Sequence, residues 1–233
     1  MTTPTLIELP ELEQGTDEWH DQRRGIVTAS VVGKLVTSKT LKPASNDESR
    51  GLTRLLTAER ITGWTDPTFV SDDMMRGIED EPKARAKYAE HYNVSVRETG
   101  FMIREDNGVK IGYSPDGLVG DDGLIEAKSR RQKKHLETVL SGHPPIENMA
   151  QMQCGLLVSE RKWCDYISYC GGMPMWISRV YPDQRWFDAI LAAVDAFEAN
   201  SAEMIRVYEE SIAGFPMTER TVINLTPEVE LEL

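Results

Sequence analysis

The middle of the chain constrains the fold most, because short strand-like runs alternate there with strong turn signals. Residues 94–104 and 109–114 are rich in residues that favour strands, and Asp106-Asn107-Gly108 between them is typical of a tight β-hairpin. A second turn at 120–123 leads into another strand-like run at 124–128. The sequence therefore predicts a β-meander at the centre of the fold.

Helical patterns lie on both sides of this meander. Thr16 is placed to cap a short helix that contains Trp19, and a second helix is expected to begin at 28–30. The other predicted elements are helices at 52–61, 80–92, 132–141, 146–159 and 184–210, the last either continuous or broken near Asn200, and strands at 163–169 and 176–181. We therefore expect an α/β fold (α+β mixed), with a central mixed sheet of about five strands flanked by helices.

A length of 233 residues fits one domain, which we expect to span residues 1–233. Residues 37–50, rich in Ser, Thr, Lys, Asn and Pro, are expected to form a flexible loop, and an acidic, apolar tail is expected from about residue 219. No apolar run is long enough for a membrane span, and residues 1–18 lack the pattern of a secretory signal. The three cysteines are an odd number, so we expect reduced thiols in a cytoplasmic protein.

The net charge of −12, from 26 basic and 38 acidic residues, argues against a protein that coats nucleic acid non-specifically. It does not exclude a nuclease, because a metal site needs carboxylates and the contacts with DNA can be confined to one channel. One short run, 128–135, holds five basic residues and no acidic residue. This run is either a solvated surface or part of a path for DNA.

Segments 112–117 and 124–128 hold the residues best suited to chemistry. Side chains two apart on a strand share a face, so Glu126 and Lys128 project together. Asp116 lies at the end of the neighbouring strand, where the meander brings it beside Glu126. Two such carboxylates form an oxygen-rich site for Mg²⁺ or Mn²⁺, beside which Lys128 can orient a metal-bound water or stabilise charge on a phosphoryl group.

The acid-x-Lys pattern by itself is weak evidence for such a site. It occurs three times, at 81–83, 126–128 and 160–162, which is not far above chance for this composition. Only 126–128 lies on a predicted strand that follows a Pro-Asp turn. The alternative is an exposed strand with a salt bridge across its face.

Other segments add residues to the predicted site. Glu81 is expected in the first turn of its helix, where it either complements the helix dipole or reaches the same metal ions. Gln153 lies on a buried helix face, where it either orients Lys128 or a water, or makes an ordinary structural hydrogen bond. Ser30, at a helix N-terminus, and Arg23 can together bind a phosphate.

These segments, in this order, resemble the phage lambda exonuclease family, the YqaJ-type viral recombinase nucleases of the PD-(D/E)xK superfamily. The resemblance runs from about Gln14 to Val158. It rests on four blocks, which are Gln14-Gly15…Trp19…Arg23…Gly25…Thr28-Ala29-Ser30, then Ser114-Pro115-Asp116-Gly117, Glu126-x-Lys128 and Gln151-x-Gln153. The resemblance implies a restriction-endonuclease-like fold.

The resemblance further implies a processive 5′→3′ exonuclease that acts on double-stranded DNA and leaves a 3′ single-stranded tail for recombination. Such enzymes form ring-shaped homotrimers threaded by DNA and work with a single-strand annealing protein. The cofactor would be Mg²⁺, with Mn²⁺ able to replace it and two ions in each site. The metal ligands would be Asp116, Glu126, the Ala127 carbonyl and Glu81.

The remaining matched residues also acquire roles from the resemblance. Lys128 would be the catalytic lysine, supported by Gln153. Arg23, Ser30 and Ser114 would form the pocket for a 5′-terminal phosphate. Mononucleotides would be released one after another from the strand end held there.

The family's apolar wedge, which parts the duplex end, is matched by position at Met74 or Met75, and ordinary core methionines are the alternative. The chain departs from the family in having Ser129-Arg130 where the family usually has a Cys-Pro-like pair. The loop at 37–50 does not align with confidence, and the acidic tail has no obvious counterpart.

Three alternatives to the exonuclease stay open. An endonuclease or resolvase can use the same catalytic residues. A non-catalytic module that binds DNA ends is the second alternative, if the acidic cluster no longer binds metal. An iron–sulfur nuclease of the same superfamily normally needs four clustered cysteines, and this chain has three.

Overall fold

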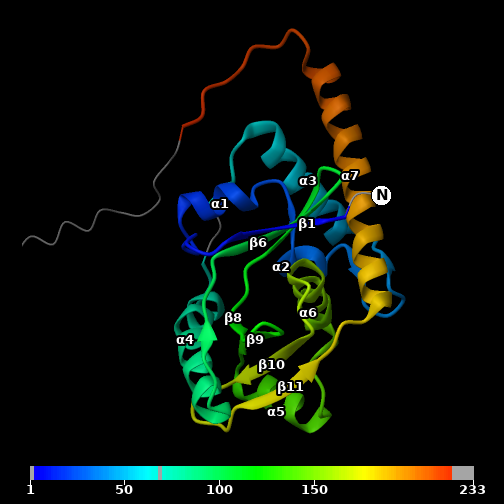
Figure 1. Cartoon of the computed structure of the whole chain (residues 1–233). Coiled ribbons are helices and arrows are strands. Elements are labelled where there is room, and N and C mark those ends of the chain that lie inside the picture. The colour runs from blue at the N-terminus through cyan, green and yellow to red at the C-terminus, as the bar shows by residue number, and fades with distance from the viewer. Residues whose placement is uncertain (1–2, 68–69, 222–233) are drawn as a thin grey trace, which may run out of the picture.

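The strands form two main sheets and one small hairpin in the computed structural model, which describes residues 3–67 and 70–221 (Figure 1). The five-stranded sheet has the order β11-β10-β9-β8-β5, formed by β5 (Val96–Arg97), β8 (Gly117–Val119), β9 (Gly123–Ser129), β10 (Trp163–Tyr169) and β11 (Trp176–Val180). The four-stranded sheet has the order β1-β6-β7-β2, formed by β1 (Thr5–Leu9), β2 (Val27–Thr28), β6 (Phe101–Asp106) and β7 (Val109–Tyr113). Strands β3 (Val36–Thr37) and β4 (Lys42–Pro43) form the hairpin.

Helices surround the two sheets. They are α1 (Asp17–Arg23), α2 (Ala29–Val32), α3 (Asp47–Thr62), α4 (Asp72–Tyr92), α5 (Gln132–Ser141), α6 (Ile146–Ser159) and α7 (Gln184–Ile212). In the five-stranded sheet β9 and β10 are parallel and the other pairs are antiparallel. The predicted mixed α/β fold is therefore confirmed, although the strands divide between two sheets. None of the helices in the described part of the chain is long and apolar enough to cross a membrane.

Strand β9 has two different faces because its side chains alternate. Ile125 belongs to a small apolar cluster with Ala84 and Tyr88 of α4. Leu124 belongs to the main core, which includes buried residues of α6 and α7. Helices α4 and α6 therefore cover opposite faces of the sheet at β9 (Figure 1). Glu126 and Lys128 share the α6 face with Leu124.

The predicted strand at 94–104 is divided between the two sheets. Strand β5 pairs with β8, whereas β6 pairs with β1 and β7. The chain turns between them at Gly100, where an added Cβ would lie 1.8 Å from the carbonyl oxygen of Leu12. This close approach to a distant segment is a tertiary contact that strand propensity does not reveal. The predicted hairpin turn is confirmed, since Asn107 and Gly108 both have positive φ.

Several helices begin earlier than their apolar patterns indicate. Helix α3 begins at Asp47, where Asn46 and Ser49 form a reciprocal capping box, so part of the expected loop at 37–50 is helix or hairpin. Helix α4 begins at Asp72 after the N-cap Ser71.

Helix α7 continues through Asn200 without a break. Most of the predicted acidic tail lies outside the described residues.

The link Ser114-Pro115-Asp116 carries the chain from one main sheet to the other. It joins β7 of the four-stranded sheet to β8 of the five-stranded sheet. Ser114 follows a strand of one sheet and Asp116 precedes a strand of the other, yet they are only two residues apart in the sequence. This link therefore fixes the position of anything held at the β7 end relative to anything held at the β8 end.

Helix α3 fixes the turn that follows α1. Gly25 has a φ of +68°, its N–H donates to Glu59 Oε2 at 2.8 Å, and its carbonyl accepts from Arg60 Nε at 2.6 Å. Arg60 also forms a two-bond ion pair with Glu198 of α7. The turn between α1 and β2 is thus held by two long helices.

We expect Gly25→Ala to lower the free energy of unfolding by about 2 kcal/mol or more, because of backbone strain and a steric clash. The added Cβ would lie 2.5 Å from Arg60 Cγ. Gly63→Ala is the matched control, since Gly63 also has a positive φ of +60° but nothing within 4 Å of the added Cβ. Urea unfolding measures both variants, and equal losses would contradict the role assigned to the Arg60 contact.

Candidate active site

The two predicted carboxylates meet where β8 and β9 run side by side. Asp116 precedes β8, and its Oδ2 accepts a hydrogen bond from the Ala127 N–H of β9 at 2.7 Å. That bond places the Asp116 carboxylate beside the residue that follows Glu126. The predicted convergence of Asp116 and Glu126 from adjacent strands is therefore present in the structure.

Glu126 is completely buried, and neither of its carboxylate oxygens accepts a hydrogen bond from any residue that the structure describes. Its one compensating contact among the described residues is an ion pair, with Lys128 Nζ 2.6 Å from Glu126 Oε1. A buried carboxylate normally accepts several hydrogen bonds, because losing them together with its water is costly. Glu126 therefore has oxygen lone pairs available for another positively charged group.

Lys128 is held from the other side by α6. Its Nζ donates to Gln151 Oε1 at 3.0 Å, so Gln151 is the residue that orients the ammonium. The expectation that Gln153 has this role is wrong. Its amide is used elsewhere, donating to the Tyr181 carbonyl at 2.8 Å and accepting from the Asp183 N–H at 2.9 Å. Gln153 instead joins α6 to the start of α7, which is the structural alternative considered for it.

Glu81 approaches the same site from α4. It lies in the middle of this helix and not in the first turn, because α4 begins at Asp72, so the helix-dipole alternative does not apply. Its Oε1 accepts from Arg85 Nη2 at 2.7 Å, and Arg85 Nε donates to the Asp116 carbonyl at 2.8 Å. Arg85 thus ties Glu81 to the segment that holds Asp116.

The electrostatics of the cluster are those of crowded, buried acids. Burial, then the negative charges of Glu126 and Glu81, raise the pKa of Asp116 well above its usual value. Burial also raises the pKa of Glu81, against the opposing effect of Arg85. Burial opposes the charged form of Lys128, but Glu126 and Asp116 outweigh it and raise the pKa of its ammonium. Three acids therefore share two cations, Lys128 and Arg85, and their negative charge is not fully compensated.

The donor set fits Mg²⁺. Within the residues that the structure describes, no three His, Cys, Asp or Glu side chains form a ready-made cluster of ligands. Mg²⁺ needs no such cluster, since it is usually held by one or two carboxylates and completes its octahedron with water and phosphate oxygens. Buried carboxylates, of which Glu126 has oxygen lone pairs that accept no hydrogen bond from the described residues, fit that type of site.

A second cluster surrounds Arg23 at the β7 end of the link between the sheets. Its guanidinium donates to Ser114 Oγ and to Ser30 Oγ, each at 3.2 Å, so the three predicted phosphate-binding residues lie together. Trp19, whose role the sequence did not reveal, stacks on Arg23 at 4.0 Å and donates to Ser114 Oγ. The spacing of four residues on α1 is the signal that would have identified this pair. Thr28 Oγ1 completes the group.

Burial, opposed by the charge of Glu59, lowers the pKa of Arg23 to about 10. Arg23 therefore stays protonated at neutral pH, in surroundings where an anion would be attracted more strongly than at an open surface. Ser30 remains exposed, so the cluster is open to solvent on one side.

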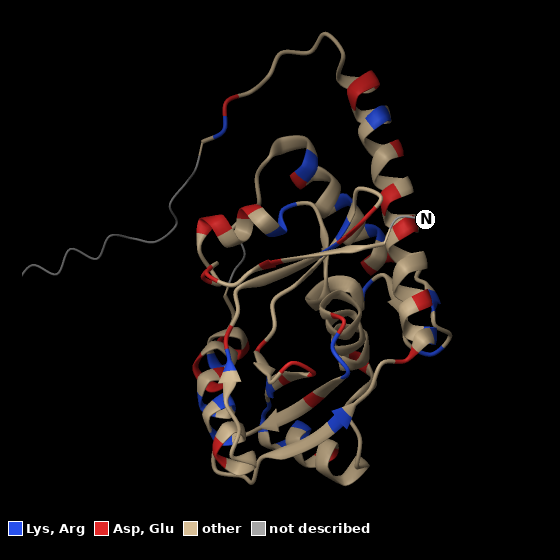
Figure 2. Cartoon of the chain, viewed as in Figure 1, with Lys and Arg blue, Asp and Glu red and all other residues tan. Residues whose placement is uncertain are grey.

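The other predicted residues lie outside these clusters. Met74 and Met75 are about half exposed in the first turn of α4, so neither is an ordinary core methionine. In the basic run 128–135, four of the five Lys and Arg side chains form ion pairs. Figure 2 shows acidic residues spread along α1, α4 and α7.

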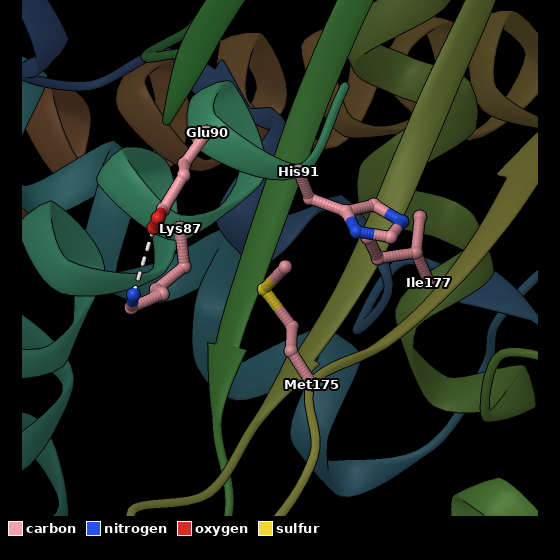
Figure 3. A pocket seen from close by; sticks show the side chains of 5 residues that line it. All are labelled: Lys87, Glu90, His91, Met175 and Ile177. Atoms are coloured by element: carbon pink, nitrogen blue, oxygen red, sulfur yellow. Dashed lines mark hydrogen bonds and ion pairs between the residues drawn. The ribbon is translucent and has the colours of Figure 1, made fainter. Parts of the chain in front are cut away.

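A cavity of about 380 Å³ lies elsewhere, between the second half of α4 and the start of β11 (Figure 3). It is lined by Lys87, Glu90, His91, Met175 and Ile177. Lys87 and Glu90 neutralise each other there as an ion pair at 2.7 Å. None of the predicted site residues lines this cavity, so the acidic cluster is not part of it.

Comparisons with known proteins agree with the fold and with the predicted family. The family model described as YqaJ-like viral recombinase domain matches residues 18–162, a range that includes every predicted site residue. The crystal structure of an alkaline exonuclease (LHK-Exo) from Laribacter hongkongensis is 34% identical, with a TM-score of 0.76, and the match covers 85% of this chain and 98% of that one. No curated protein matches the chain.

Two further solved structures are similar. LHK-Exo in complex with dAMP is 33% identical over 85% of this chain and 98% of that chain, with a TM-score of 0.74. A phage-related exonuclease from Haemophilus somnus 129PT is 13% identical over 78% of this chain and 96% of that chain. Its TM-score of 0.61 supports the fold alone.

We expect Asp116→Asn to abolish DNA cleavage and to stabilise the metal-free protein at pH 8 by about 1 kcal/mol or more, since each unit of pKa shift is worth about 1.4 kcal/mol. The pKa of Asp116 is raised in the folded state. Ionisation of Asp116 therefore costs stability once the pH rises above the pKa of about 3.9 that an Asp has in the unfolded chain. The gain should therefore be absent near pH 4. Unfolding in EDTA at the two pH values measures it, and equal stabilities at pH 8 would contradict the assigned electrostatics.

The two glutamines of α6 provide a paired test. Gln151→Leu is expected to slow DNA cleavage at least about tenfold with little loss of stability, because the Lys128 ammonium loses its partner. Gln153→Leu is expected to lower the free energy of unfolding by about 1–3 kcal/mol and to leave the turnover of folded molecules near normal, because it leaves buried polar groups unpaired. The reverse pattern would restore Gln153 as the support of Lys128.

Proposed function

The chain belongs to the YqaJ-like viral recombinase family, and from this premise we propose that it is a Mg²⁺-dependent 5′→3′ exonuclease. In this proposal it degrades one strand of linear double-stranded DNA from a 5′-phosphorylated end, releasing mononucleotides and leaving a 3′ single-stranded tail. One observation carries the proposal. The Arg23 cluster and the buried acidic cluster are joined through Ser114-Pro115-Asp116, so an anion-binding group lies beside a candidate metal site.

The Arg23 cluster is suited to a terminal phosphate. A terminal phosphate monoester carries nearly two negative charges, one more than an internal phosphodiester, and has three oxygens free to accept hydrogen bonds. The Arg23 guanidinium and the hydroxyl groups of Ser30 and Ser114 provide donors of that number and kind. These groups would hold the strand end, while the acidic cluster acts on the next phosphodiester bond.

Asp116, Glu126 and the Ala127 carbonyl would hold the metal ions, and Glu81 would bind metal or position water. Bound Mg²⁺ supplies charge to the scissile phosphate and lowers the pKa of a coordinated water, and Mn²⁺ can do the same. Lys128 carries its proton because its pKa is raised, so its part is that of a cation and hydrogen-bond donor. Gln151 keeps that donor in place.

The relatives support this activity, and the rest of the proposal follows the family. The related nuclease from Laribacter hongkongensis was crystallised with dAMP, a deoxynucleoside monophosphate of the kind such an exonuclease releases. Met74 or Met75 would part the duplex end as an apolar wedge, consistent with their exposure. A toroidal homotrimer around DNA and a single-strand annealing partner in the cytoplasm complete the proposal.

The decisive experiment digests linear duplex DNA bearing either 5′-phosphate or 5′-hydroxyl ends, with a closed circle in the same reaction. The wild type with Mg²⁺ should release mononucleotides from 5′-phosphorylated ends and leave the circle intact. Cutting of the circle would indicate an endonuclease or resolvase. An absence of cleavage with Mg²⁺ and with Mn²⁺ would indicate a module that binds DNA ends.

Arg23→Met should reduce the preference for 5′-phosphorylated over 5′-hydroxyl ends by about tenfold or more, because a charge-assisted hydrogen bond to phosphate is worth about 1.5–3 kcal/mol. Cleavage of 5′-hydroxyl ends should change little, because Arg23 makes no contact with the acidic cluster among its hydrogen bonds. Arg24→Met is the control, since the Arg24 side chain is paired with Asp21. An unchanged end preference in Arg23→Met would remove the phosphate pocket from the proposal.

A further inference from the structure

Among the described residues, two buried polar groups in or beside the acidic cluster have no hydrogen-bond partner, although the first also has its ion pair with Lys128. One is the Glu126 carboxylate, and the other is the hydroxyl group of Tyr113 at the end of β7. Both side chains are essentially inaccessible to solvent. A buried hydroxyl without a partner is costly, and so is a buried carboxylate, so the two groups call for a common explanation.

Helix α6 packs against the Tyr113 ring, and its contacts with β9 indicate that the Tyr113 hydroxyl lies level with Glu126. A Cβ added at Gly155 would lie 2.7 Å from Tyr113 Cζ, the ring atom that bears the hydroxyl group. Gly155 is one helical turn beyond Gln151, which holds Lys128. The four-residue step from Gln151 to Gly155 spans about 6 Å along the helix, and the two-residue step from Lys128 back to Glu126 spans about 6.6 Å along β9.

The direction of α6 supports this alignment. Residues 160–162 connect α6 to β10, which lies parallel to β9, so α6 runs back along β9 in the opposite sense. Moving from Gln151 to Gly155 on α6 therefore corresponds to moving from Lys128 to Glu126 on β9. The electrostatics agree, because after burial the charge of Glu126 is the strongest influence on Tyr113.

We propose that Tyr113 is a positioning residue for Glu126, acting through an ordered water that accepts from the Tyr113 hydroxyl and donates to the Glu126 carboxylate. Buried waters usually bridge polar groups that are otherwise unsatisfied, and such a bridge is nearly as favourable as a direct hydrogen bond. Lys128 fixes Glu126 through Oε1, and the water fixes it from the side of β7. Glu126 is then already oriented before it binds a cation. This step rests on the proposed function, in which Glu126 is a metal ligand.

The choice of residue types fits this role. Phenylalanine would fill the same space without a buried hydroxyl, and glycine at 155 leaves the room that the ring occupies. The two cysteines nearest to Tyr113, Cys154 and Cys164, are buried free thiols and weak hydrogen-bond partners. Asp116 also acts on Tyr113, but more weakly than Glu126 does, and its Oδ2 already accepts from the Ala127 N–H. Glu126 is therefore the acceptor that best matches the Tyr113 hydroxyl in this part of the core.

The test is Tyr113→Phe, measured in two ways on the full-length protein. Without metal, Tm should fall by a few degrees, because the water loses its donor and Glu126 loses the water. The dissociation constant for Mn²⁺, measured by calorimetry or by electron paramagnetic resonance, should rise about threefold to tenfold. A Tm that is unchanged or higher, together with unchanged Mn²⁺ affinity, would overturn the proposal, because deleting a truly unpartnered hydroxyl relieves a penalty.

Tyr88→Phe is the matched control. Tyr88 is equally buried, but its hydroxyl donates to Asp165 at 2.6 Å on the opposite face of the sheet. It should lose stability and keep its Mn²⁺ affinity, which separates a general effect of losing a buried hydroxyl from an effect on Glu126. An equal loss of Mn²⁺ affinity in both variants would overturn the positioning role.

A high-resolution crystal structure of the wild type keeps the inference testable if Tyr113→Phe does not fold. Electron density for a water within hydrogen-bond distance of both groups supports it, and a dry contact overturns it. A wild type that binds no Mn²⁺ and cleaves no DNA would instead count against the proposed function. In that case the water and the change in Tm would still decide whether Tyr113 holds Glu126.

Discussion

The ion pair between Glu126 and Lys128 is the interaction on which the rest of the site depends. Removing a carboxylate completely from water costs several kcal/mol even after relaxation, and one ammonium at 2.6 Å offsets only part of this cost. Such a pair needs further hydrogen bonds, and Gln151 provides one to the lysine. The remaining deficit falls on Glu126, because its oxygens accept no hydrogen bond. In the proposed function a bound divalent cation would remove this deficit, because it adds positive charge beside the Glu126 oxygens.

The division of the strands between two sheets gives the site its second half. The chain leaves one sheet at Ser114 and enters the other after Asp116, so the serine that contacts Arg23 and the carboxylate that accepts from Ala127 are held two residues apart by a short, proline-containing link. Proline fixes its own φ and restricts the residue before it, which keeps this link in one conformation. Helix α3, through Gly25 and Arg60, fixes the turn that carries Arg23 toward the same link. Spacing between the clusters is therefore set by covalent geometry more than by contacts that can shift.

Local patterns predicted the elements that depend on local physics. The bounds of α5, α6 and β10 agree with the structure because apolar periodicity, caps and turns determine them. The convergence of Asp116 and Glu126 followed from the alternation of side chains in a meander. The choice between Gln151 and Gln153 did not follow, because it depends on how α6 is rotated on the sheet, and a change of two residues turns a helix by more than half a revolution. Long-range contacts, such as that of Gly100 with Leu12, were likewise out of reach.

Charge neutralisation within the protein limits how it can meet DNA. The basic run 128–135 is the one that suggested a path for the duplex, yet most of its cations are paired with acids of the same chain. Counter-ion release from many phosphates drives non-specific binding, and paired cations contribute little to it. An acidic chain with net charge −12 also repels the duplex at long range. In the proposed function, recognition then depends on groups that only a DNA end presents, such as a terminal phosphate. The Arg23 cluster would bind that phosphate, and its burial would make each contact count for more than a contact on an open basic surface.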